Sequence, residues 1–91
     1  MEKKNKDALI IAGALKRLTE FRLPRALSRK KKVDSGEVLD DFDLKFLQRA
    51  LNDARDINPV LERNPQYLKL RDKAVGLCDQ ILKKSAENEA N

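Results

Sequence analysis

The sequence contains no histidine and a single cysteine, Cys78, among its 91 residues. One chain therefore cannot form an intrachain disulfide or any of the usual zinc sites made of thiolate and imidazole ligands. The imidazole base that commonly activates a serine or cysteine nucleophile is missing as well. These absences argue against an enzyme, a metal or cofactor protein and a disulfide-stabilised secreted domain, and they favour a reducing, cytoplasmic location.

Aromatic residues, glycine and proline are also scarce. The chain has three Phe, one Tyr and no Trp, and three each of Gly and Pro. A β-sandwich or barrel needs many turns and strands rich in β-branched and aromatic residues, so both are disfavoured. The apolar run Ala8 to Leu15 is far shorter than the roughly 20 residues that span a bilayer. Asp7 before this run and the absence of a small-residue cleavage pattern after it disfavour a signal peptide.

Apolar residues recur at helical spacing in three stretches, which predicts an all-α protein. We expect a small three-helix bundle with helices at about 7–22, 40–57 and 65–86, folded as one domain. Residues 1–6 and 87–91 are expected to be flexible ends. The bundle should run up and down, with the second and third helices forming an antiparallel hairpin.

The stretch 40–57 carries the clearest helix signal in the chain. Asp40 is a favourable N-cap residue, and Asp43, three positions later, completes an acidic variant of the capping box. On a helical wheel Phe42, Phe46 and Leu47 fall on one apolar face, which predicts that this face packs in the core. The acids at the start of the helix are explained by capping, so we assign them no catalytic or metal-binding role.

Prolines predict where the helices end. Pro24 is expected to end the first helix, because it lacks a backbone N–H and restricts the residue before it. The chain would then continue as a long, basic connection up to residue 38, with at most a short helical turn after Pro24. Asn58-Pro59 and Asn64-Pro65 each pair an N-cap with a Pro at the first helical position, so 59–63 should form a single turn.

The antiparallel hairpin predicts one ion pair. Arg71 interrupts the apolar half of the last helix and needs a carboxylate or a route to solvent. In the expected register it lies opposite Asp53, so we predict that these two side chains pair.

Charge is distributed in blocks along the chain. Residues 1–32 hold eleven cations and three acids, 33–62 hold three and eight, and 63–91 hold six and four, which gives +8, −5 and +2 and sums to the net charge of +5. Two interpretations remain open: the basic segment lies over the chain's own acidic helix, or it binds phosphates of a nucleic acid. The candidate contact residues are Arg22, Arg25, Arg29, Lys30, Lys31 and Lys32.

The first helix has more apolar surface than a simple bundle requires. Leu9 and Ile10 lie beyond its main apolar stripe, and Gly13 sits near Leu9. Gly76 falls in the middle of the polar face of the last helix, where Gly costs about 1 kcal/mol relative to Ala. Either these glycines are tolerated on a solvated surface, or another backbone approaches them, in a dimer or a partner complex. Leu9, Ile10, Gly13 and Gly76 are therefore the candidate partner face.

Two functions are consistent with these features. The first is a non-catalytic helical module that binds a protein partner or a second copy of itself. The second is nonspecific association with nucleic acid through the segment 22–32. Salt separates the two, because phosphate binding releases counterions. Binding to DNA or RNA that weakens steeply with salt and is lost when the six cations become Gln would support the second, and no retention on either at low salt would exclude it.

Overall fold

A computed structural model describes residues 2–91, with side chains from residue 6 onward, and every element in that part of the chain is helical. The long elements are α1 (Glu2–Arg17), α2 (Leu23–Asp34), α3 (Asp41–Asp56) and α5 (Leu68–Ala90). Three short ones connect or extend them: the π-helical turn η1 (Leu18–Arg22), α4 (Asn58–Glu62) and the 3₁₀ turn η2 (Pro65–Tyr67). The all-α class is as the sequence predicts. The expected single turn is present as α4, but Asn58 is its first residue and not its N-cap, which is Ile57.

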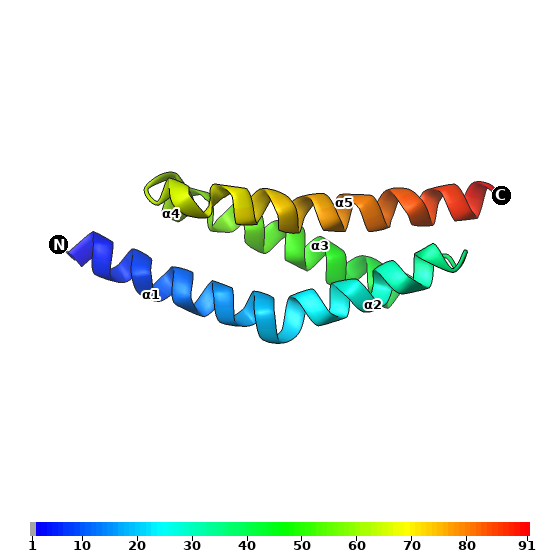
Figure 1. Cartoon of the computed structure of the whole chain (residues 1–91), viewed down its shortest axis with the longest axis horizontal. Coiled ribbons are helices and arrows are strands. Elements are labelled where there is room, and N and C mark those ends of the chain that lie inside the picture. The colour runs from blue at the N-terminus through cyan, green and yellow to red at the C-terminus, as the bar shows by residue number, and fades with distance from the viewer. Residues whose placement is uncertain (1) are drawn as a thin grey trace.

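The helices form an elongated body of 54 × 20 × 18 Å. In Figure 1, α1 and α2 run in one direction, α3 returns between them and α5, and α5 runs back antiparallel to α3. The first arm of this up-down arrangement is therefore the continuous α1–η1–α2 segment, which is about twice as long as the predicted first helix.

The prediction that Pro24 ends the first helix is wrong. The residues assigned to a long basic connection instead form α2, and Pro24 sits in its first turn, where a missing N–H is tolerated. The turn before it widens to π geometry, with the Leu23 amide donating to the Leu18 carbonyl five residues back. Such a bulge relieves the clash that a proline ring makes with the preceding turn. The segment between α2 and α3 is thereby reduced to 35–40.

The helix bends where the π turn lies. Figure 1 shows α1 and α2 as the two limbs of a shallow V whose vertex points away from α5. Thr19, in the π turn, donates its hydroxyl to the Leu15 carbonyl at 3.0 Å, a type of contact that also bends helices. The V is consequently closest to the other helices at its two ends.

At the α1 end, one carboxylate and a small apolar cluster hold the limb in place. Asp7 is almost fully buried and accepts hydrogen bonds from Nε and Nη2 of Arg63, both at 2.9 Å, and from Asn64 at 3.1 Å. Ile11 packs with Val60 and Leu61 of α4. A bidentate Arg–carboxylate contact of this kind fixes orientation as well as distance.

At the α2 end lies the larger core, and α5 extends over it. The Asn88 side chain donates to the carbonyls of Val33 and Glu37, each at 2.7 Å, and the Leu39 amide donates to the Ser85 hydroxyl. These contacts lie near or beyond residue 86, the predicted end of the last helix, which in fact continues to Ala90. The buried residues of this cluster are Ala26, Val33, Leu39, Leu47, Cys78 and Ile81.

The start of α3 contains the predicted capping box. The Asp43 amide donates to Asp40 Oδ1 at 2.9 Å, and the Asp40 amide donates to Asp43 Oδ2 at 3.2 Å. The prediction that Phe42 packs in the core is wrong, since its side chain is 82% exposed. Asp43 turns inward in this first turn because two cations of α2 meet its carboxylate there: Arg29 Nε at 3.0 Å and Lys32 Nζ at 2.8 Å.

The predicted pair between Asp53 and Arg71 is also wrong. Asp53 bonds to the Arg22 guanidinium, which reaches it from the π turn. Arg71 instead donates to Asp72 at 2.8 Å and to the Asn58 side chain at 2.7 Å. The prediction failed because it considered only the α3–α5 hairpin and left out the first arm of the bundle as a source of cations.

Asp43 generates the first structural prediction. Burial raises the pKa of its carboxyl, but hydrogen bonds from Lys32 and from the Asp40 amide outweigh that effect, and the pKa lies below its ordinary value of 3.8. Stabilisation from a carboxyl whose pKa is lowered by folding is present above the unfolded value and disappears as pH falls through the folded value. Asp43→Asn should therefore lower the free energy of unfolding by about 1–3 kcal/mol at pH 7.

The difference from the wild type should shrink as pH falls below about 4. Chemical denaturation at several pH values measures this change. Asp41→Asn, at an exposed position in the same first turn, is the matched control and should change stability by about 0.5 kcal/mol or less. An Asp43→Asn effect that is no larger than the control, or that is independent of pH, would contradict the assignment.

Candidate functional site

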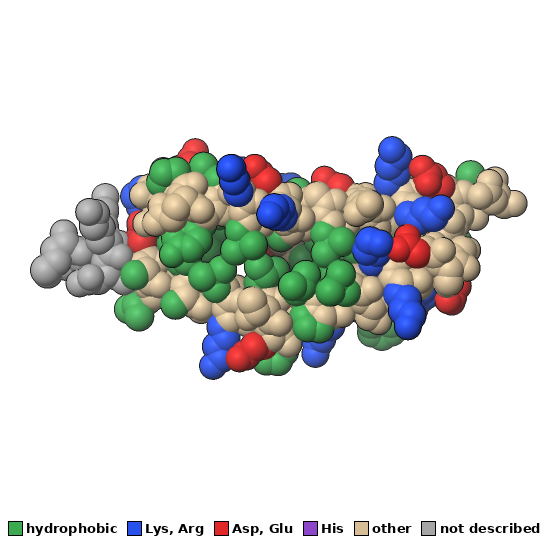
Figure 2. All heavy atoms as spheres, in the orientation of Figure 1, with side chains coloured by type: hydrophobic (Ala, Val, Ile, Leu, Met, Phe, Trp, Pro, Cys, Tyr) green, Lys and Arg blue, Asp and Glu red, His purple; other side chains and the backbone are tan. Residues whose placement is uncertain are grey.

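An apolar groove lies under the bend of the first arm. It has a volume of about 430 Å³, within the range of ligand-binding pockets. Figure 2 shows it as a hollow lined by hydrophobic side chains between α5 and the α1–α2 arm. Its walls and floor include Ile10, Ala14 and Leu18 from the first arm, Ala50, Ala54 and Ile57 from α3 and its end, and Tyr67, Leu70, Ala74 and Leu77 from η2 and α5.

The groove exists because the two apolar clusters do not meet. One cluster is centred on Ile11, Val60 and Leu61, and the other on the packing of α2 with α3 and α5. Between them the bend carries the first arm away from α5, and several small Ala side chains line the space that is left. Protein interiors are normally packed without voids of this size, so the middle of the bundle lacks the side chains that would complete it.

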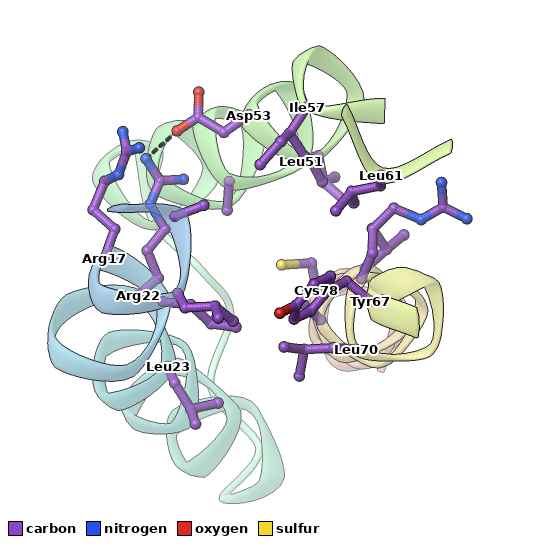
Figure 3. Close-up of a pocket in the computed structure, with 18 of the residues that line it drawn as sticks. Arg17, Arg22, Leu23, Leu51, Asp53, Ile57, Leu61, Tyr67, Leu70 and Cys78 are labelled. Carbon is purple, nitrogen blue, oxygen red and sulfur yellow. Dashed lines mark hydrogen bonds and ion pairs between the residues drawn. The ribbon is translucent and has the colours of Figure 1, made fainter. Parts of the chain in front are cut away.

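Arg22 is one of the charged residues that line this apolar space. Its Nη2 bonds to Asp53 across the edge of the groove, and Arg17 lies beside it (Figure 3). Its other terminal nitrogen, Nη1, is buried and has no hydrogen-bond partner in the part of the chain that the structure describes. An unsatisfied buried donor of a charged group costs about 1–3 kcal/mol or more, so an acceptor that displaced the atoms covering this nitrogen would remove that cost.

Two further polar atoms point into the groove. In Figure 3 the hydroxyl of Tyr67 and the sulfur of Cys78 are directed toward the space enclosed by the helices. Burial raises the pKa of the Cys78 thiol, so the thiol is protonated at neutral pH and is a poor nucleophile. These atoms add weak hydrogen-bonding capacity to an otherwise apolar lining.

Most of the six candidate cations pair with the chain's own acids. Arg22 bonds to Asp53, Lys30 bonds to Asp34 at 2.7 Å, and Arg29 and Lys32 share Asp43. Arg29 also lies over the Phe46 ring, 4.1 Å from its centroid. The basic segment thus lies along the acidic helix α3, which is the intramolecular interpretation of the charge blocks.

Arg25 and Lys31 are the two members of the set that contact no carboxylate among the described residues, and both are exposed. Two free cations give a much weaker phosphate-binding strip than six. The structure therefore brings Arg22, Arg29 and Lys32 to acids of α3, pairs Lys30 with an acid of its own helix, and leaves Arg25 and Lys31 on the surface.

The four residues of the candidate partner face are not part of one surface feature. Ile10 lines the groove, whereas Leu9 is 75% exposed outside it. A Cβ added at Gly13 or at Gly76 would meet no heavy atom of the described residues within 4 Å, so no close approach in that part of the chain explains either glycine.

The sequence does not predict the groove. Leu18, Ala74 and Leu77 have the spacing of ordinary core residues, and no pattern in the sequence distinguishes a filled from an unfilled position. The one available signal was the surplus of apolar residues on the first helix, which the structure places partly on the groove wall, as with Ile10 and Ala14.

No protein-family model, no curated protein and no solved structure matches this chain. Within the residues that the structure describes, no group of three or more Cys, Asp or Glu side chains could hold a metal ion. None of the described helices is both long and apolar enough to cross a membrane. The case for a function therefore depends on the groove and its surroundings.

Filling the groove should stabilise the protein. Ala14→Leu adds apolar atoms to a wall position without a loss of helix propensity, and we expect it to raise the free energy of unfolding by about 0.5–2 kcal/mol. Ala8→Leu, at an exposed position on the same helix outside the groove, is the matched control and should change it by about 0.5 kcal/mol or less. Urea denaturation measures both. Destabilisation by Ala14→Leu, as in overpacked cores, would show that the space is not free.

Proposed function

We propose that this protein is a non-catalytic interaction module that binds one α-helix of a partner protein in the groove under the bend. The observation that carries the proposal is the unfilled apolar space between the first arm and α5. Helix-in-groove binding, in which an amphipathic helix lays its apolar face into such a space, is a common mode of protein recognition.

The arrangement of the helices supports a helical occupant. The groove is bordered by α1 and η1 on one side, by α5 on a second and by α3 on a third. A fourth helix laid along it would complete a four-helix arrangement around a common apolar core. Small side chains on the lining, such as Ala14, Ala50 and Ala74, favour the close approach of another helix.

The chemistry of the lining supports binding more than catalysis. Its polar atoms are an arginine already engaged by Asp53, a tyrosine hydroxyl and a protonated thiol. None of these is paired with a general base in the described residues, and an activated nucleophile needs one. The remaining lining is apolar and supplies affinity through burial, at roughly 25 cal/mol per Å² of apolar surface removed from water.

A peptide selection tests the proposal. A displayed library of helical peptides of about 18 residues, or five turns, is selected on the native protein, and the affinities of the selected peptides are measured by titration calorimetry. We expect amphipathic peptides whose affinity falls about tenfold or more on Ala14→Phe, because a Phe at this wall position occupies the space that the peptide needs.

Gly76→Lys is the control, since Gly76 is exposed on α5 and does not line the groove. It should leave the affinity unchanged. A selection that yields no helical binder, or binders that are indifferent to Ala14→Phe, would overturn the proposal. Binders that are lost on Gly76→Lys and kept on Ala14→Phe would move the docking surface to the polar face of α5.

A further inference from the structure

We infer that the helix docked in this groove carries a carboxylate, an Asp or Glu beside its apolar stripe, that bonds to Arg22. This inference rests on the proposed function and specifies the chemistry of the partner. It begins from the buried Nη1 of Arg22, which lacks a hydrogen-bond partner among the described residues although it belongs to a charged group.

The guanidinium is held in a fixed position for such a contact. Asp53 engages Nη2 and leaves Nη1 free, and the Arg22 side chain is only 23% exposed (Figure 3). An arginine that is already oriented loses little conformational freedom when it donates hydrogen bonds to a second carboxylate. A carboxylate also suits the site better than a neutral acceptor, because hydrogen bonds between ionised groups are roughly twice as strong.

The charges around the groove favour an acidic partner. Arg17 lies beside Arg22, and among the described residues Asp53 is the one carboxylate bonded to this pair. Asp56 also lines the groove, but so does Arg71, whose guanidinium is engaged by Asp72 and Asn58. The edge near Arg17 and Arg22 is thus positive, and the chain as a whole carries +5. An approaching acidic helix would be attracted and a basic one repelled.

The same charges argue against a second copy as the occupant. A second copy carries the same net charge of +5 and the same two arginines at its groove edge, so two chains repel one another as they approach. Like charges brought together in a desolvated contact cost free energy, which a heterologous acidic helix avoids. The occupant that fits the site is therefore a helix of a different protein.

The position of Arg22 restricts where the acid stands in the partner. Arg22 belongs to the same turn of the first arm as Leu18, a residue of the groove wall. The partner's acid must then flank its apolar stripe, with apolar residues three or four positions away on the same face. The expected pattern is an acidic residue within an i, i+3, i+4, i+7 apolar series, and not an acidic tail.

Peptides from the unbiased library test the inference. We expect an Asp or Glu at one preferred position next to the apolar stripe, and replacing it by Asn or Gln should weaken binding about tenfold or more. Arg22→Gln in the protein should weaken it to a similar extent. The two changes together should weaken it little more than either alone, as for partners in one contact.

Arg25→Gln is the matched control, because it removes an exposed cation of the same arm that does not line the groove. It should change the affinity less than about twofold at physiological salt. If Arg22→Gln fails to fold, as judged by circular dichroism, the peptide substitution measured on the wild-type protein still decides the matter. Equal losses from Arg22→Gln and Arg25→Gln would show general charge attraction and overturn the specific contact.

The failures of the two proposals are distinguishable. Helical peptides that need the groove but show no preferred acid would overturn this inference and leave the proposed function standing. A groove that binds an acyl carboxylate such as decanoate, and selects no helical peptide, would overturn both. Self-association that depends on Ala14 and Arg22, measured by analytical ultracentrifugation, would assign the groove to a second copy and overturn the acidic partner.

Discussion

The bend at the π turn before Pro24 is the constraint on which the rest of the structure depends. Because the ring of Pro24 would clash with the preceding turn of a straight α-helix, that turn widens, and the Leu23 amide reaches back five residues to the Leu18 carbonyl. The two limbs are then fixed at their far ends, by Asp7 with Arg63 and by the apolar core around Val33. A bent arm held at both ends bows outward in the middle, and the groove is the space beneath it.

Ion pairs between the helices stabilise this arrangement and leave the groove open. The basic α2 lies along the acidic α3, and Asp43 gathers Arg29 and Lys32 into one partly buried cluster that also caps the helix. The block pattern of charge along the sequence is thereby neutralised within the fold at one end of the molecule. Arg22 with Asp53 is the polar link at the groove edge, and it leaves one donor unsatisfied.

The sequence predicts those parts of the fold that local chemistry determines. The capping box of Asp40 and Asp43 and the single turn at α4 follow from residue types at short spacing, and the structure has both. The helix through Pro24, the exposure of Phe42 and the partner of Asp53 were predicted wrongly, because each depends on which arm packs alongside. The groove could not be predicted, since a core residue and a groove residue such as Leu18 have the same pattern and differ only in whether a neighbour fills the space.

The central claim is that the middle of the bundle is open and apolar. Xenon, which enters apolar cavities and reports on them through neighbouring methyl groups, tests it without a partner. Under xenon pressure, the methyl NMR signals of Ile10, Leu18 and Leu70, which line the groove, should shift, whereas those of Val33 and Ile81 in the packed core should not. Shifts at neither set, or at the packed core alone, would show that the groove is closed in solution and would contradict the account.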